Sequence, residues 1–112
     1  MPVYLVEMWI PKDGKERECL EVSKKILEYI RKHREKFRKR RSHRVFRVFI
    51  GDKPWFIDVQ EYDDLKSMEE LDKRISKDRQ YIELIIEWKK CIDSKESRSL
   101  LLFDVLRDLW IE

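Results

Sequence analysis

The segment HRVFRVFIGDKPWFIDVQEY, residues 43–62, decides the fold, because it contains two strand-forming runs joined by a short turn. The tetrapeptide Gly51-Asp52-Lys53-Pro54 separates the runs and holds the glycine and proline that tight turns favour. The sequence therefore predicts an antiparallel hairpin with strands at residues 43–50 and 55–62.

The two faces of this hairpin differ, because side chains alternate between the faces of a strand. We place the turn at Asp52 and Lys53. One face is then apolar except at its far end, with the cross-strand pairs Ile50–Trp55, Val48–Ile57, Phe46–Val59 and Arg44–Glu61. The other face is mixed, with the pairs Phe49–Phe56, Arg47–Asp58 and Val45–Gln60. We expect the apolar face to lie under helices.

The residues before the hairpin predict a strand and then a helix. Residues 3–10 are rich in strand formers, and Pro11 ends that run. Residues 15–39 carry apolar side chains at helical spacing among Lys, Glu and Arg, as an amphipathic helix does.

A second helical pattern follows the hairpin, starting near Leu65 behind a cap at Asp63 or Asp64. We expect a break at residues 77–79, where Asp78 can restart the helix. Residues 97–106 are predicted as a fourth strand, with a short helix as the alternative.

The predicted order is β-α-β-β-α-β in a single domain, residues 1–112. Short antiparallel connections combined with two crossover helices predict a ferredoxin-like α+β sandwich, in which helices cover one face of a four-stranded antiparallel sheet.

The mixed face of the predicted sheet carries side chains that are too large and apolar for a solvated surface, namely Leu5, Trp9, Phe49 and Phe56. Large apolar patches mark interfaces, and the simplest partner is a second copy related by two-fold symmetry. The sequence thus predicts a homodimer with these residues on the dimer face.

Charged residues make up 44% of the chain, while Ala, Thr and Asn are absent, which is typical of hyperthermophile proteins. A membrane-spanning run and a signal-peptide pattern are both absent, so we expect a cytoplasmic protein with no membrane partner. The sequence also lacks a glycine-rich phosphate loop, a zinc-ligand spacing and a nucleophile-elbow motif, so no cofactor or metal is expected.

The layout resembles the dimeric α/β-barrel superfamily, which includes antibiotic-biosynthesis monooxygenase-like and NIPSNAP-like domains. The resemblance lies in the opening strand at residues 3–9, in residues 55–63 leading into Leu65 and Met68, and in the tail from Lys77 to Ser99. It implies a homodimer that is a cofactor-independent monooxygenase-like enzyme or a binder of small apolar or aromatic ligands. The heme-degrading members rely on an Asn-His-Trp set, and this chain has no Asn.

Two groups of residues are candidates for a site. Glu7, Arg47 and Asp58, joined by Asp104, predict a polar cluster inside the dimer barrel; this cluster could serve acid–base chemistry or only fix the strand register. Four other side chains could line a pocket between sheet and helices, or simply form core: Tyr4, His33, Trp55 and Tyr62.

Residues 31–47 hold ten Lys or Arg residues and one acid, Glu35. The patch at its centre consists of Arg38, Lys39, Arg40, Arg41 and Arg44. Such density could bind nucleic acid or phosphate, or could be a solvated end that pairs with acidic helix faces. A non-catalytic assembly protein is the third alternative.

Overall fold

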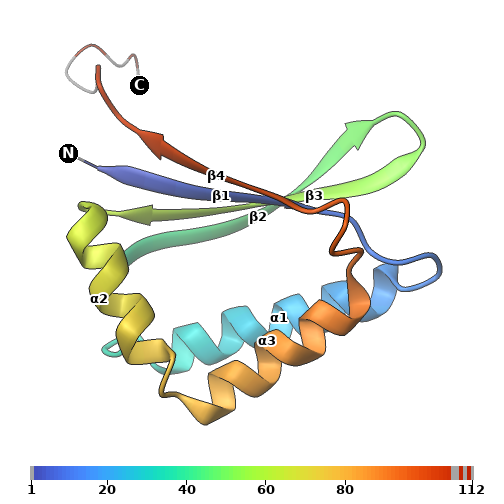
Figure 1. Cartoon of the computed structure of the whole chain (residues 1–112), viewed down its shortest axis with the longest axis horizontal. Helices are drawn as coiled ribbons and strands as arrows, with labels where there is room; N and C mark the ends of the chain where they lie inside the picture. Colours follow the sequence, from blue (N-terminus) through green and yellow to red (C-terminus); the bar gives the residue numbers. More distant parts are fainter. Residues whose placement is uncertain (1, 107–108, 110, 112) are drawn as a thin grey trace.

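The computed structural model of the chain describes residues 2–106, 109 and 111, and describes residues 49 and 50 by their backbone alone. Strands β1 (Val3–Trp9), β2 (Arg40–Ile50), β3 (Lys53–Tyr62) and β4 (Arg98–Phe103) form one antiparallel sheet in the order β2-β3-β1-β4. Helices α1 (Glu16–Lys32), α2 (Leu65–Ile75) and α3 (Arg79–Cys91) lie on one side of it (Figure 1). The predicted ferredoxin-like α+β sandwich is confirmed.

The hairpin turn is one residue earlier than predicted. Ile50 pairs with Lys53, so the two turn residues are Gly51 and Asp52. Gly51 has a φ of +63°, and a positive φ at the first turn position is what two-residue hairpins need. The register of β2 against β3 therefore differs by two residues from the predicted one: Arg47 lies opposite Phe56 rather than Asp58.

The prediction of which face the helices cover is wrong. The helices cover the mixed face, which we call the helix-side face: Val3, Leu5, Glu7 and Trp9 of β1, His43, Val45 and Arg47 of β2, and Phe56, Asp58, Gln60 and Tyr62 of β3. The apolar face is uncovered in the single chain, and we call it the open face: Tyr4, Val6, Met8, Phe46, Val48, Trp55, Ile57, Val59, Leu100 and Leu102.

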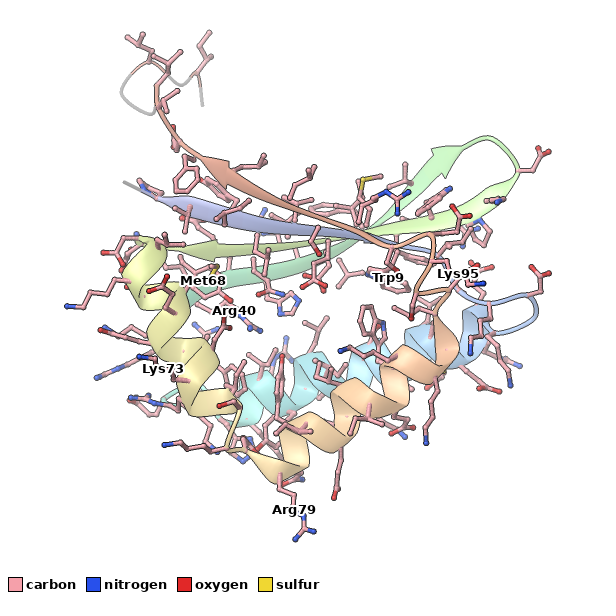
Figure 2. All side chains as sticks on the ribbon, in the orientation of Figure 1. Trp9, Arg40, Met68, Lys73, Arg79 and Lys95 are labelled. Carbon is pink, nitrogen blue, oxygen red and sulfur yellow. The ribbon has the colours of Figure 1, made fainter. Side chains whose placement is uncertain are left out.

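The helices cover the mixed face because it carries the largest side chains of the core. Trp9 and Phe56 are almost fully buried and stack with ring centroids 4.6 Å apart, and Trp88 of α3 packs edge-on against Trp9. Figure 2 shows Trp9 between the sheet and the helices. Asp58 contacts His43 and Gln60, and Arg47 pairs with Glu16 of α1, so covering these charged groups is tolerated. Hydrophobicity alone therefore predicts the wrong face of the sheet to lie under the helices.

Helix α1 ends at Lys32, earlier than the predicted end at residue 39. The ring of His33 closes it, with Nδ1 donating a hydrogen bond to the carbonyl of Tyr29 at 2.9 Å. Tight turns then carry the chain to Phe37, which is buried against Tyr29 and Tyr81. Phe37 matched the helical pattern because it belongs to the same core as the helix.

The predicted break in the second helical segment is confirmed. Asp64 caps α2 by accepting a hydrogen bond from the backbone N–H of Ser67, and Asp78 caps α3 by accepting from that of Tyr81. Asp78 Oδ2 also accepts hydrogen bonds from the Tyr29 hydroxyl at 2.5 Å and from Lys36 Nζ at 2.8 Å. The cap of α3 thus ties α3 to α1 and to the segment that follows α1.

Removing the Asp78 cap of α3 should destabilise the folded chain more than removing the Asp64 cap of α2. We expect Asp78→Ala to lower the free energy of unfolding by about 2–4 kcal/mol, and Asp64→Ala by about 1 kcal/mol, since among the described residues the Asp64 side chain makes the cap bond alone. Urea unfolding at fixed protein concentration measures both. Equal losses for the two variants would show that the bonds to Tyr29 and Lys36 add nothing.

The same contacts predict acid sensitivity. Hydrogen bonds from Lys36 and Tyr29 outweigh burial and lower the pKa of Asp78 from 3.8 to about 2. A carboxyl with a lowered pKa stabilises the folded state fully above its ordinary pKa, and this contribution is lost as the pH falls toward 2.

Within the part of the chain that the structure describes, no helix has both the length and the apolar character needed to cross a membrane.

Candidate functional site

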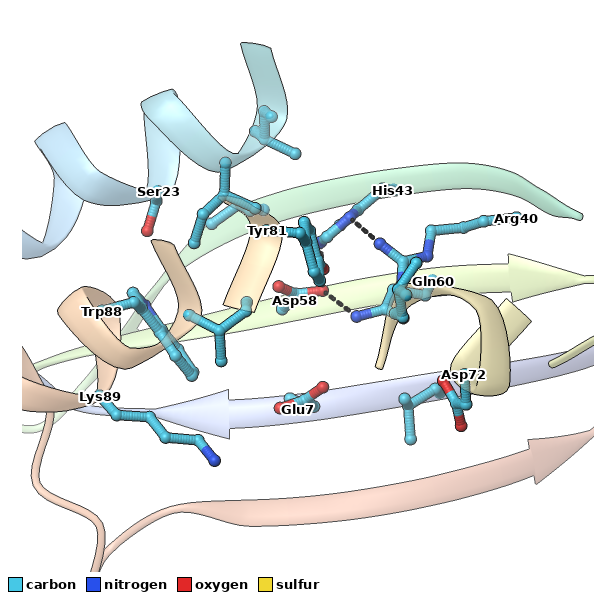
Figure 3. A pocket seen from close by; sticks show the side chains of 16 residues that line it. Glu7, Ser23, Arg40, His43, Asp58, Gln60, Asp72, Tyr81, Trp88 and Lys89 are labelled. Carbon is cyan, nitrogen blue, oxygen red and sulfur yellow. Dashed lines mark hydrogen bonds and ion pairs between the residues drawn. The ribbon is translucent and has the colours of Figure 1, made fainter. Parts of the chain in front are cut away.

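A cavity of about 260 Å³ lies between the helix-side face and the three helices (Figure 3). Aliphatic side chains and the ring of Trp88 form its walls; the aliphatic set is Leu5, Ile26, Leu27, Val45, Ile75 and Ile85. One end is polar, and there Arg40, His43, Asp58 and Glu7 gather from β1, β2 and β3. An apolar chamber with a few converging polar groups is the usual form of a small-molecule site.

A chain of hydrogen bonds anchors the polar end. Arg40, 6% exposed, donates from Nε to the Tyr62 hydroxyl at 2.9 Å. That hydroxyl donates to Gln60 Oε1 at 2.7 Å, and Gln60 Nε2 donates to Asp58 Oδ1 at 3.4 Å. Burial raises the pKa of Tyr62 to about 12, so its hydroxyl keeps its proton and can donate. The Asp58 carboxylate is therefore held by a chain of bonds that runs along β3 to Arg40 of β2.

His43 connects the guanidinium of Arg40 to the same carboxylate. Arg40 Nη1 lies 3.1 Å from His43 Nδ1, and because a guanidinium can only donate, Nδ1 accepts. The ring proton is then on Nε2, which lies 2.8 Å from Asp58 Oδ1. Nε2 is buried, and this contact has the distance of an ion pair but an angle that does not make a hydrogen bond. In this arrangement the Asp58 carboxylate, and not the His43 ring, is the group that can accept a proton from a bound molecule.

A β-bulge at the start of β2 makes this arrangement possible. Arg40 pairs with Tyr62 and Ser42 with Glu61, so Arg41 is the extra residue. Without the bulge, Arg40 and His43, three residues apart, would point to opposite faces. Strict alternation along the sequence cannot show this, and so the sequence did not predict that Arg40 enters the pocket.

Glu7 and Asp58 lie directly opposite each other on β1 and β3. Burial raises the pKa of Glu7 above its ordinary value of 4.5, and the negative charge of Asp58 raises it further. The folded state therefore binds the Glu7 proton more tightly than the unfolded chain does. For this group, stability is greatest below pH 4.5 and declines as the pH rises through the raised pKa.

The direction of this pH dependence can be tested with a variant of Glu7. Glu7→Gln keeps the shape and removes the charge, so we expect it to be more stable than the natural chain at pH 7 and to lose that advantage at pH 4. Urea unfolding at the two pH values measures the difference. Glu69→Gln, on the exposed surface of α2, is the control and should show a much smaller pH-dependent difference.

The structure brings together half of the predicted polar cluster, Glu7 and Asp58, in the pocket of a single chain rather than in a dimer barrel. Arg47 is instead paired with Glu16 of α1, because the register moves it two residues away from Asp58. Asp104 follows β4, where its backbone N–H bonds to the carbonyl of Pro2.

The predicted pocket residues are mostly elsewhere. Tyr4 and Trp55 lie on the open face, and His33 caps α1. Tyr62 does reach the site, through its bonds to Arg40 and Gln60. The predictions for Tyr4 and Trp55 are wrong for one reason, the inverted assignment of the sheet faces.

The predicted dimer-face residues follow the same inversion. Leu5 lines the pocket, and Trp9 and Phe56 are core residues under the helices. The side chain of Phe49 lies outside the described residues. One apolar face of the sheet is still uncovered in the single chain. It is the open face, and not the face that carries the predicted residues.

The basic patch is divided. Arg40 is buried in the pocket, whereas Lys39 pairs with Glu70 of α2 and Arg41 with Asp63. Arg38 and Arg44 are exposed. Lys39 and Arg41 of the predicted patch therefore pair with acidic side chains. This agrees with the alternative in which the basic segment is a solvated end that pairs with acids.

Sequence reasoning missed several pocket residues: Gln60, Tyr81, Trp88 and Lys89, besides His43 and Arg40 as members of the site. No local pattern marks them, since each is ordinary for its strand or helix. Among residues 2–106, 109 and 111, no three His, Cys, Asp or Glu side chains are grouped to hold a metal ion.

The fold matches solved structures along nearly the whole chain. A NIPSNAP family protein from Agrobacterium tumefaciens matches with a TM-score of 0.74 at 17% identity, over 95% of each chain. SnoaB, a cofactor-independent oxygenase from Streptomyces nogalater, matches with a TM-score of 0.67 at 9% identity, over 93% of each chain. The chain shares the α+β fold of these proteins. At these identities the likeness shows the fold and leaves the activity open.

A third structure with this fold comes from Bacteroides fragilis. It is described as a dimeric protein of unknown function and ferredoxin-like fold, and it matches with a TM-score of 0.63 at 14% identity, over 90% of this chain and 94% of that one. No protein-family model matches the chain, and no curated protein matches it either.

Proposed function

We propose that the protein is a homodimer whose subunits each bind a small, flat, largely apolar molecule in the cavity between sheet and helices. The observation that carries the proposal is the cavity itself, in which aliphatic walls and Trp88 lead to buried Arg40 and to the partly buried His43, Asp58 and Glu7. Apolar walls favour a hydrocarbon or aromatic body, and the polar end favours a hydroxyl or carbonyl group on it.

The polar end can do more than orient the ligand. The Asp58 carboxylate can take a proton from an acidic hydroxyl or C–H group of the ligand. Removing such a proton requires a base and no cofactor. Cofactor-independent oxygenation, the activity described for SnoaB, is the finer proposal for this pocket, with molecular oxygen as co-reactant.

The homodimer part of the proposal rests on the open face. Its β-branched and aromatic side chains form an apolar surface of the kind that two sheets bury when they pack face to face. Leu100 and Leu102 extend it, and both are about half exposed in the single chain. The dimeric neighbour from Bacteroides fragilis supports this arrangement.

Calorimetric titration with 2-naphthol, a flat aromatic that carries one acidic hydroxyl, tests the site. We expect the natural chain to bind it and Ile85→Trp, which fills the cavity, to lose binding. Ile86→Trp is the matched control, because Ile86 is 49% exposed on the outer side of α3. Asp58→Asn should weaken binding about tenfold, by removing a charged hydrogen-bond acceptor. Binding that survives in Ile85→Trp would place the ligand elsewhere.

A further inference from the structure

A second hollow lies between α1 and the edge strand β2, with a volume of about 580 Å³. We call it the outer groove. It shares Ser23, Leu27 and Val45 with the inner cavity, so these three side chains form a boundary common to both. The outer groove therefore lies next to the cavity, on the side from which a ligand could enter past β2.

The groove combines an apolar floor with a cationic rim. Leu20 and Leu27 of α1, with Val45 and Phe56 of the sheet, form the floor. Lys24, Arg31 and Arg47 stand around it, against one acid, Glu28. Lys24, Leu27 and Arg31 recur at helical spacing and thus line one face of α1.

The cations of the rim differ in what they contact. The guanidinium of Arg47 lies 5.6 Å from the centre of the Phe56 ring and pairs with Glu16. Lys24 and Arg31 are exposed, and among the residues the structure describes neither has a carboxylate within ion-pair distance. Both can therefore meet an incoming anion without first giving up a partner.

The inner end holds two carboxyl groups, and its one guanidinium, Arg40, is already engaged by Tyr62 and His43. Glu7 and Asp58 face each other there, and the pKa of Glu7 is raised by burial and by the negative charge of Asp58. Another anion at that end would be repelled and would also lose its hydration. A ligand with one anionic group is consequently oriented, with that group outward.

We propose that the outer groove and the inner cavity form one elongated site that selects an anionic amphiphile. The inference rests on the proposed function and narrows its ligand class. The flat apolar body passes Leu27 and Val45 into the cavity, and a carboxylate, sulfate or phosphate group stays at the rim beside Arg31 and Lys24. The anion remains partly hydrated there, so it binds without the cost of full burial.

Two probes with the same ring system test the inference, namely 2-naphthoate and 2-naphthalenemethanol. Calorimetric titration at low salt is expected to show naphthoate binding about tenfold more tightly than the alcohol. Arg31→Met should weaken naphthoate about fivefold and leave the alcohol unchanged. Arg34→Met is the matched control, since Arg34 is exposed and lies outside the groove; it should change neither affinity.

The outcomes separate this inference from the proposed function. If both probes bind with equal affinity, or if Arg31→Met weakens both equally, the cavity binds ligands and the anionic class is wrong. If neither probe binds, the proposed function fails and the inference fails with it. Loss of the naphthoate preference at 0.5 M salt, with the alcohol unaffected, supports a charge contact at the wet rim.

Discussion

Ile57→Glu is expected to separate the homodimer into single 14.0 kDa chains. Ile57 lies on the open face at the middle of the sheet, with Met8 opposite it on β1 and Phe46 opposite it on β2. A carboxylate at this position would be buried without a partner when two open faces meet. Association should weaken about 100-fold or more, which sedimentation equilibrium over a range of micromolar concentrations measures.

Ile86→Glu makes the same change of residue on the other side of the molecule. Ile86 is exposed on α3 and takes no part in the open face. We expect this control to keep the mass of the natural chain. If both variants stay dimeric, the subunits associate through another surface; if both dissociate, the effect reflects added charge and not the face.

Arg40→Met should lower the free energy of unfolding by about 3–5 kcal/mol, because it removes a buried cation and leaves the partly buried Asp58 and Glu7 without its compensating charge. The guanidinium also bonds to Tyr62 and His43 and lies over the ring of Phe37 at 5.6 Å from its centre. Urea unfolding measures the loss, with protein concentration held constant because unfolding of a dimer depends on it.

Arg41→Met is the neighbouring control. Arg41 is exposed and pairs with Asp63 at the surface, where an ion pair contributes about 0–1 kcal/mol. Similar losses for the two variants would contradict the view that Arg40 compensates the partly buried carboxyls of the pocket.

The fold was accessible from the sequence because its signals are local. The glycine and proline around residues 51–54 mark the hairpin, and Asp78 marks the start of α3 after a gap in the apolar pattern. Such signals depend on backbone conformation and capping, which a few neighbouring residues determine. The end of α1 was placed too late, since Phe37 is buried with the helix residues without belonging to the helix.

The site was accessible only in part, because it depends on non-local geometry. Glu7 and Asp58 were grouped correctly, since both lie on the mixed face of their strands. Arg40 and His43 share a face only through the bulge at Arg41, and Arg47 moves away because the turn is one residue earlier. Neither the bulge nor the turn position can be read from hydrophobic alternation.

The face assignment failed for a related reason. Apolar residues were expected under the helices, yet the helix-side face accommodates its charges through mutual contacts around Asp58. The more uniformly apolar face is left uncovered in the single chain. Where both faces of a sheet carry large apolar side chains, hydrophobicity cannot say which face the helices cover.

The central claim is that the two faces of the sheet serve two purposes, with the ligand on the helix side. Methyl ¹H–¹³C spectra of the natural chain during titration with 2-naphthol test this directly. We predict shifts at the cavity methyls of Leu5, Ile26, Ile75 and Ile85, with the open-face methyls of Val6, Ile57 and Val59 unmoved. Shifts confined to the open-face methyls would contradict the account.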